Sequence, residues 1–373
     1  MSSRATSSGA RTGLFETFRS DFRDARAALR RQGVSQTAHH TAQDLREFFL
    51  SDDQQRLLAT KHPLVAWFWL SVWLLKALVL NLSPGRRLLL LLSAALVWLS
   101  FQGNTGSRGG SVLLALAPVV VVLLLELKDK LLARYELEDG RAVQQALMPA
   151  TSPSVPGWDV WMFTRPANDV GGDLVDHLRV SDDRYAVALA DVAGKGLPAA
   201  LLMAKLQATV RALAPDVASL GALGAKLNAI LCRDGLPDRF ATLAYLELSA
   251  NAGTVRLLDA GHPPPLLRTG SVVGELEVGS GALGFMPDTV FVEQRVDLQP
   301  SDALVVYSDG ITEAMNAEGE FFGLERLRAV VVASSPAAAS ALGSAIVSTV
   351  DAFVGEAPRH DDLSLLVVRR VLD

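Results

Sequence analysis

The sequence predicts an α+β domain that follows a helical membrane region. A block of Leu, Val, Ala and Trp with few charges, over residues 64–125, indicates the membrane region. From Trp158 onward, short apolar runs separated by turns lie between two or three helical stretches, which indicates the α+β domain. Because the strands cluster and the helices stand apart from them, layered sheets and helices are favoured over a repeat of parallel βαβ units.

Length, charge and cysteine content exclude several classes of protein. A chain of 373 residues exceeds what one hydrophobic core usually organises and predicts two or three structural units. A formal net charge of -5 argues against a strongly basic protein, so we expect no nucleic acid among the partners. Cys232 is the only cysteine, which excludes an intramolecular disulfide and a cysteine-based zinc cluster.

Composition divides the chain into five segments. Residues 1–62 are polar and rich in arginine, and we expect them in the cytoplasm. The same shifts in composition place a membrane region at 63–125, a linker helix at 126–148, a proline-rich linker at 149–157 and a soluble domain at 158–373.

Two apolar runs are expected to cross the membrane as a helical hairpin. Residues 88–101 and 112–125 would each be about 21 Å long as helix, so each needs its flanks to cross a hydrocarbon core of ~30 Å. We therefore place the spans at about residues 87–103 and 110–126. The alternative is the buried helical core of a soluble protein, but two of the three apolar runs lack the polar face that such a core needs.

Positive charge favours a cytoplasmic soluble domain. Arg86 and Arg87 precede one span and Lys128 follows the other, and such residues near span ends tend to stay cytoplasmic. The first apolar run, residues 64–82, is then an interfacial or re-entrant helix. Its length also allows a third crossing, so both arrangements stay open. Either one predicts a multi-pass protein of the cell inner membrane, with the lipid bilayer as a partner.

Residues 126–148 read as an amphipathic connecting helix, because apolar residues recur at spacings of three and four. Gly140 weakens its middle, and there are fewer than four clean heptads for a sustained coiled coil. A short helix that pairs two copies of the chain as a homodimer is an alternative that the pattern leaves open. Pro149, Pro153 and Pro156 then end the helix before the soluble domain.

The soluble domain contains several segments with clear periodicity. Strands are predicted within "RYAVALAD", "FATLAYLELSA", "TVRLLDAG", "PPPLLRTG", "FVEQRVDL", "DALVVYSD" and "DLSLLVVRRV". Helices are predicted within "LPAALLMAKLQATVRALAP", "GLERLRAVVVAS" and "PAAASALGSAIVSTVDAFV".

Acidic residues stand where the predicted strands meet loops. Asp173 follows two glycines, Asp191 and Asp309 each close an apolar run, and Asp361 and Asp362 open the last strand. Adjacent strands lie about 4.8 Å apart, so carboxylates at the edge of a single sheet can converge. Each acid alone is ordinary turn chemistry. As a set they predict a site for hard divalent ions such as Mg²⁺ or Mn²⁺, which favour oxygen ligands.

The set also resembles a known family. The motifs that carry the resemblance are "RAVQQALMP", "RPANDVGGDLVD", "LADVAGKGLPAALLMA", "DAGHPPPLL", "YSDGITEAMN" and "RHDDLSLLVVRR", in this order. Together they resemble the bacterial branch of the metal-dependent, protein phosphatase 2C-like (PPM) serine/threonine phosphatases, which is typified by sporulation stage II protein E and the sigma-factor-regulating phosphatases. The resemblance covers about residues 141–370.

The resemblance implies an α/β/β/α sandwich with two Mn²⁺ or Mg²⁺ ions in a cleft at one sheet edge. By this resemblance Asp191 would bridge both ions and the backbone carbonyl of Val192 would complete one site, which Asp173 would support. Asp309 and Asp361 would hold the other ion. Asp362 is the alternative to Asp361 if the register at the doublet differs by one, and Asp191 and Asp309 are the expected catalytic residues.

The function implied is hydrolysis of phosphoserine or phosphothreonine on a signalling protein by attack of a metal-bridging hydroxide. In this branch the substrate is often a phosphorylated anti-sigma-factor antagonist. The alternative function is a catalytically weak, membrane-bound scaffold that keeps the fold and acts by protein binding. A scaffold of this kind would be expected to lack at least one metal-binding acid, whereas all are present here.

Three further residues carry weaker predictions. Arg165 could contact the substrate phosphate, although an exposed surface arginine is at least as frequent. His262 could donate a proton to the leaving oxygen, although a histidine at such a junction is more often structural. Lys195 lies in "AGKG", which lacks the spacing of a nucleotide-binding phosphate loop.

The predicted helix at "GLPAALLMAKL" directly follows Asp191, so a small shift of this helix could move that carboxylate. A two-state element next to a ligand site is what a switch requires. We therefore predict that the membrane region sets the position of this helix through the linker helix.

Overall fold

The structure of the protein is a computed structural model. It describes residues 79–102, 108–149, 151–234, 239–250, 252–334 and 338–371, together with single positions between 65 and 76. The chain divides into two compact units, residues 1–129 and 130–373. The predictions made for residues 1–62, and most of those for the apolar run at 64–82, lie outside the described residues.

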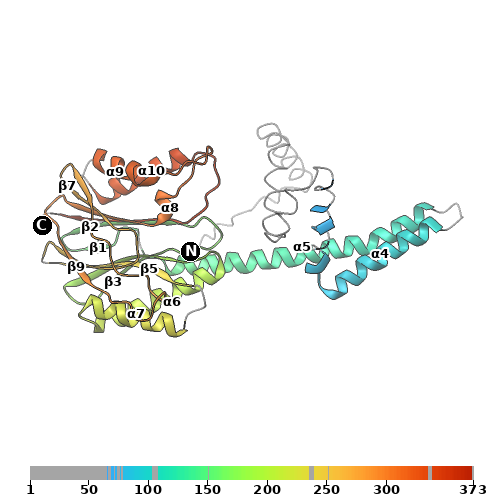
Figure 1. Ribbon diagram of the computed structural model, residues 1–373, viewed down its shortest axis with the longest axis horizontal. Helices are drawn as coiled ribbons and strands as arrows, with labels where there is room; N and C mark the ends of the chain where they lie inside the picture. Colours follow the sequence, from blue (N-terminus) through green and yellow to red (C-terminus); the bar gives the residue numbers. More distant parts are fainter. Residues whose placement is uncertain are drawn as a thin grey trace, which may run out of the picture. The chain divides into compact units, whose positions relative to one another are not determined.

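The first unit contains a helical hairpin. α4 (Pro84–Gln102) begins with a proline, where no helical hydrogen bond is needed, and α5 spans Arg108–Leu147. The guanidinium of Arg86 pairs with Glu126 at 2.6 Å and also with Asp129. Since these acids lie well along α5, the two helices run antiparallel (Figure 1). α5 is continuous across the predicted border at residues 125–126.

Among the described residues, a single helix is long and apolar enough to cross a membrane, Leu197–Asp216. This helix packs on a sheet of the second unit, and core helices of that kind meet the same criteria. The side chains of residues 100–103 and 110–115, which fall within the two predicted spans, are outside the description.

The second unit contains two antiparallel sheets (Figure 1). Sheet A has the order β1 (Ser154–Val155), β2 (Trp158–Arg165), β11 (Leu363–Arg370), β10 (Ala303–Tyr307), β7 (Leu266–Thr269) and β8 (Val272–Glu275). Sheet B has the order β3 (Leu174–Arg179), β4 (Arg184–Val192), β5 (Ala241–Ser249), β6 (Thr254–Ala260) and β9 (Glu293–Asp297).

Helices cover the outer face of each sheet, which makes an α/β/β/α sandwich. α6 (Leu197–Leu213), the 3-10 turn η1 (Ala214–Asp216) and α7 (Leu220–Asp234) pack on sheet B. α9 (Gly323–Ala333) and α10 (Ala339–Val354) pack on sheet A, and the single turn α8 (Asp309–Thr312) follows β10. A third hydrophobic cluster fills the space between the sheets.

The packing of strand β11 explains why its sequence is a continuous apolar run. Leu366 and Val368 point into the cluster between the sheets, whereas Leu365 and Val367 point toward α9 and α10. Because successive side chains alternate between two buried layers, both faces of the strand must be apolar. The same reasoning applies to the apolar run of β4, which has alanines on its helix-facing side.

Most predicted strands and helices are confirmed within one to three residues. Two differences matter for the site. The run that ends at Asp309 is a strand only as far as Tyr307, because Asp309 opens α8. β2, β3 and α7 were not among the elements identified from the sequence.

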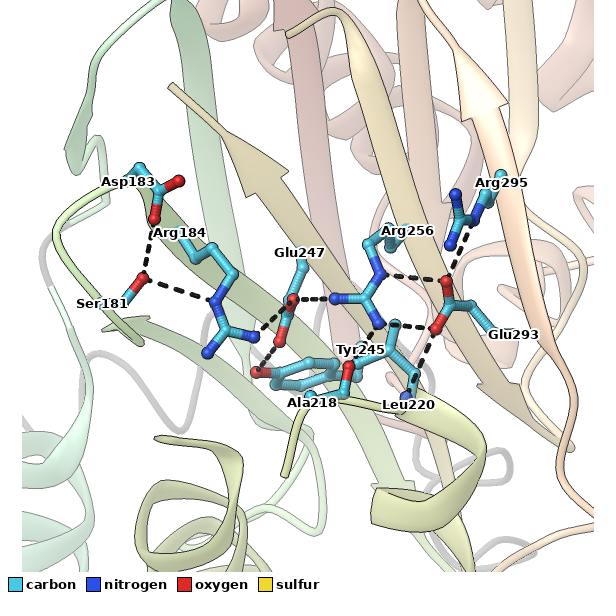
Figure 2. A network of polar contacts seen from close by, with 10 residues as sticks. All are labelled: Ser181, Asp183, Arg184, Ala218, Leu220, Tyr245, Glu247, Arg256, Glu293 and Arg295. Atoms are coloured by element: carbon cyan, nitrogen blue, oxygen red, sulfur yellow. Dashed lines mark hydrogen bonds and ion pairs between the residues drawn. The ribbon is translucent and has the colours of Figure 1, made fainter. Parts of the chain in front are cut away.

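A chain of ion pairs crosses sheet B (Figure 2). Arg256 on β6 bonds Glu247 on β5 at 2.8 Å and Glu293 at 2.9 and 2.6 Å. It also donates to the carbonyl of Ala218, and the amide of Leu220 donates to Glu293. The network therefore fastens the start of α7 to three strands.

Candidate active site

The five predicted acids come together at one end of the sandwich, but from both sheets. Asp173 and Asp191 each lie one position beyond the last β3–β4 pair, Leu174 with Ala190, and so are neighbours across sheet B. Asp309 follows β10 and Asp361 precedes β11, which are adjacent in sheet A. The prediction that a single sheet edge gathers these acids was therefore wrong.

Asp362 fastens the two sheets together at this end. Its carboxylate accepts hydrogen bonds from the amides of Ala167 at 2.8 Å, Gly172 at 2.6 Å and Asp173 at 3.3 Å. Its side chain is buried. Because these bonds use both oxygens, Asp362 shapes the loop that presents Asp173, whereas the neighbouring Asp361 is exposed to solvent.

Two glycines allow the segments to approach this closely. A Cβ atom at Gly172 would lie 3.1 Å from the carbonyl oxygen of Val192. A Cβ atom at Gly310 would overlap the carbonyl of Asp362. The motifs "GGD" and "SDG" thus place backbone against backbone beside the acids, which a larger residue would prevent.

The acids repel one another. Burial, then the charges of Asp309 and Asp361, raise the pKa of Asp191 from 3.8 to about 6. Burial and Asp191 raise the pKa of Asp173 well above its ordinary value, and Asp173 Oδ2 is buried without a hydrogen-bond partner. Burial and Asp361 also raise the pKa of Asp309. The site therefore favours binding of positive charge.

The donor set fits a hard divalent ion, because every candidate ligand is an oxygen atom and one buried carboxylate oxygen lacks a partner. Within the described residues, no three acidic, histidine or cysteine side chains lie close enough to form a complete metal cluster. Mg²⁺ usually keeps several waters and uses only one or two carboxylates, so this spacing does not exclude such an ion.

Asp191→Asn is expected to stabilise the ion-free protein as pH rises. A raised folded-state pKa means that ionisation of Asp191 opposes folding, so this contribution weakens the wild-type protein progressively from pH 3.8 to about 6. Asparagine removes it, and the variant should gain about 1–3 kcal/mol above pH 6. Thermal unfolding in EDTA between pH 4 and 7.5 measures the difference, and a gain that does not depend on pH would contradict the raised pKa of Asp191.

Arg165 lies beside the acids but is already paired. Its guanidinium donates to Asp351 at 3.0 Å through Nη1 and at 2.5 Å through Nη2. It lines a narrow pocket next to Asp361, together with Glu313 and Arg359. The charge of Arg165 is thus balanced by Asp351, and its contact with a substrate phosphate stays a prediction.

His262 is a buried, neutral ring. Its side chain is 4% exposed, and burial lowers its pKa to about 3. Nδ1 lies 2.9 Å from the hydroxyl of Thr242, which in turn donates to the carbonyl of Asp191 at 3.4 Å. This placement favours a role in positioning β4, and the predicted proton donation to a leaving group stays untested.

The helix after Asp191 is held at both ends. Gly196, in a left-handed conformation at φ 73, is the N-cap of α6, and Pro198 lies in its first turn. Near the other end, Arg211 binds the carboxylate of Asp176 through two nitrogens. The Asp176 side chain is only 1% exposed, so this ion pair is anchored in the interior.

Two buried glutamines connect the linker helix to the site. Gln144 on α5 donates to the carbonyl of Gly171 at 2.8 Å and accepts from its amide at 3.2 Å. Gln207 on α6 donates to the carbonyl of Leu147 at 3.0 Å. Sequence reasoning did not identify either residue. The pattern that could have revealed them is a polar residue at a helix position where the apolar periodicity predicts burial.

Comparison with known proteins identifies the family. A family model described as stage II sporulation protein E (SpoIIE) matches residues 181–371, just over half of the 373-residue chain. The chain belongs to this family. The resemblance that the motifs predict is therefore confirmed, and the SpoIIE-family match includes the segments with Asp191, Asp309 and Asp361.

Relatives of this SpoIIE-family chain include two named bacterial proteins. It is 26% identical over 300 residues to protein IcfG of Synechocystis sp., a match that covers 72% of the chain and 46% of IcfG. It is 25% identical over 239 residues to phosphoserine phosphatase RsbU of Bacillus subtilis, which covers 64% of the chain and 70% of RsbU. The chain thus spans about half the length of IcfG.

A solved structure supports the fold. The SiaA-PP2C domain of Pseudomonas aeruginosa matches with a TM-score of 0.55 and 21% identity. The match covers 66% of this chain and 99% of that domain. The second unit therefore has a PP2C-like fold, which confirms the expected sandwich.

Proposed function

We propose that the chain is a metal-dependent serine/threonine protein phosphatase. The observation that carries the proposal is the cluster of Asp173, Asp191, Asp309 and Asp361, in which burial and mutual repulsion raise the pKa of the first three. Such a cluster opposes folding unless it binds cations. The similarity to RsbU, which is named a phosphoserine phosphatase, supports the same reaction class.

The proposed ligands follow the placement of each oxygen. Asp191, the carbonyl of Val192 and Asp173 would serve one ion, and Asp191, Asp309 and Asp361 the other. Asp361 is preferred to Asp362, since three backbone amides already occupy the Asp362 carboxylate. Bound divalent ions would supply water of lowered pKa and would neutralise charge on the phosphoryl group.

The protein's own groups would position these ligands. Asp362 holds the Ala167–Asp173 loop, and His262 supports the Asp191 backbone through Thr242. The pocket beside Asp361 lies where residues flanking a phosphoserine could bind. These contacts would fix the ligand geometry before a substrate arrives.

The test is release of phosphate from a phosphoserine peptide by the purified chain, with Mn²⁺ and after chelation with EDTA. We expect activity with Mn²⁺ and its loss in EDTA. The second candidate is a scaffold that keeps the fold and acts by protein binding. Inactivity at saturating Mn²⁺ would favour the scaffold.

We further propose that residues 87–103 and 110–126 cross a membrane, with the second unit in the cytoplasm. The support is the antiparallel hairpin and its apolar surface, which includes Leu88, Leu91 and Trp98 with exposed fractions of 66–67%. α4 and the part of α5 that precedes the charged residues at 126–130 are each about as long as a bilayer core is thick. Sodium carbonate extraction of membranes would release the chain if this proposal is wrong, and protease accessibility would distinguish two from three crossings.

The substrate we propose is a phosphorylated signalling protein such as an anti-sigma-factor antagonist. Capture by the Asp309→Asn chain followed by mass spectrometry tests its identity. The exposed Leu131 and Tyr135 on α5 support a homodimer through the linker helix. Light scattering of the purified chain tests this state, which a monomeric mass would exclude.

Regulation through the linker helix is proposed on the two glutamine contacts. Gln144→Leu would leave the buried amide and carbonyl of Gly171 without partners, which disturbs the loop before Asp173. We expect kcat/KM to fall about 10- to 100-fold, as for outer-shell partners of metal ligands, with a higher Mn²⁺ requirement. The exposed neighbour Gln145→Leu is the control. Equal activity of the two variants would contradict a coupling between the linker helix and the site.

A further inference from the structure

Lys195 occupies a loop that the fold brings against the acids. The loop between β4 and α6 has left-handed glycines on either side of the lysine, Gly194 at φ 106 and Gly196 at φ 73. Arg239 holds the loop from outside by donating to the carbonyl of Ala193 at 2.8 Å. Residue 195 is thus presented from a tight turn four positions after Asp191.

The ammonium of Lys195 contacts one candidate ligand and acts on another. Nζ lies 3.3 Å from Asp361 Oδ2 and donates to the carbonyl of His360. Burial and the charge of Asp361 raise the pKa of Asp309, and the charge of Lys195 offsets part of this effect. Across the described residues, no other ion pair with Asp173, Asp191, Asp309 or Asp361 is present.

The Lys195–Asp361 pair is open to solvent. The side chains are 54% and 44% exposed, so the pair contributes little stability and its two groups can separate easily. A lysine side chain is long and flexible, and its three N–H donors suit oxyanions from several directions. The lysine can therefore leave Asp361 without moving the backbone.

We propose that Lys195 is a tethered cation that occupies Asp361 in the ion-free protein and binds the substrate phosphoryl group once a divalent ion takes Asp361. This inference rests on the proposed function. A carboxylate oxygen used by a divalent ion is no longer available to the ammonium, which is then held by its loop within reach of the same site. A phosphoryl oxygen, also anionic, is its natural next partner.

The proposal predicts opposite changes in two affinities. Lys195→Met removes the competitor for Asp361, so Mn²⁺ should bind about three- to fivefold more tightly, as expected for loss of an exposed ion pair. It also removes a charge-assisted bond to phosphate, so inorganic phosphate should bind about tenfold more weakly. Misfolding would weaken both.

The experiment uses the full chain in detergent micelles. Calorimetry measures Mn²⁺ binding after EDTA treatment, and the shift of thermal unfolding by inorganic phosphate is measured at saturating Mg²⁺. Lys195→Arg should keep the wild-type phosphate affinity. Lys205→Met is the matched control, since Lys205 forms an ion pair with Asp234 of equal length, 3.3 Å, away from the acids.

Tighter Mn²⁺ binding together with weaker phosphate binding in Lys195→Met would support the proposal. Unchanged or weaker Mn²⁺ binding, or unchanged phosphate binding, would overturn it. A wild-type chain that binds neither Mn²⁺ nor phosphate would instead refute the proposed function. The two failures are therefore distinguishable without any measurement of activity.

Discussion

Asp309→Asn is expected to lower kcat/KM toward a phosphoserine peptide by about a thousandfold, which corresponds to about 4 kcal/mol of transition-state stabilisation. Asparagine has nearly the shape of aspartate but no charge. Asp309 opens α8 through its backbone, which the substitution leaves in place. The loss should therefore come from the site and not from the fold.

Two measurements separate loss of charge from loss of structure. Mn²⁺ binding by Asp309→Asn should weaken strongly, while thermal unfolding of the ion-free variant should occur at the wild-type temperature or above it, since repulsion with Asp361 is removed. Asp169→Asn is the matched control, because Asp169 is an exposed acid in the Ala167–Asp173 loop. Activity of Asp309→Asn within tenfold of the wild type would exclude Asp309 as a metal ligand.

The sequence was informative where burial alone decides the structure. The apolar runs of β4, β10 and β11 are buried on both faces, so they could be identified as strands without knowledge of their partners. The acids at their ends followed from the same runs. These acids could be recognised together from the sequence alone, because each stands where an apolar run meets a loop.

The pairing of segments could not be predicted in the same way. The six residues of β3 mix apolar and charged side chains, so the sequence does not reveal the register with β4 that brings Asp173 beside Asp191. Asp361 and Asp362 are adjacent in sequence, and only contacts with distant segments distinguish them: the amides of the Ala167–Asp173 loop bind Asp362, and Lys195 pairs with Asp361. Such contacts between distant segments leave no local periodicity.

α7 was missed for a related reason. Its buried face includes Gly224, where a Cβ atom would come 2.7 Å from the ring of Phe291. Two glycines, Gly221 and Gly224, lower the intrinsic helix propensity of the segment, and contact with the loop before β9 outweighs that cost. Tertiary packing therefore supports the helix at the two positions where glycine weakens its local propensity.

Arg256→Met is expected to cost about 3 kcal/mol, because removal of one partner leaves a buried carboxylate without compensation. Glu247 is 2% exposed and would keep only two long contacts, at 3.5 Å each, with Arg184 and with the hydroxyl of Tyr245 (Figure 2). Methionine retains much of the apolar stem, so the change mainly reports the lost charge. Glu293 would also lose its two bonds from Arg256.

The stability penalty of Arg256→Met is also expected to change with pH in a defined direction. Arg256 is the main cause that lowers the pKa of Glu293 from 4.5 to about 2, so this contribution to stability is present above pH 4.5 and is lost as pH falls toward 2. The difference between wild type and Arg256→Met should therefore shrink over the same interval. A penalty that stays constant from pH 6 to pH 3 would mean that packing, not charge, is responsible.

Hydrogen exchange in the full chain can locate the effect. Amides of β5 and β6 should lose protection by about two orders of magnitude at neutral pH, as a penalty of about 3 kcal/mol requires. Arg295→Met is the control, since Arg295 also contacts Glu293, at 3.2 Å, but is 72% exposed. Because exposed pairs contribute about 0–1 kcal/mol, this variant should resemble the wild type. Equal losses of amide protection in both variants would show that the burial of Glu247 is not what makes the Arg256 contacts stabilising.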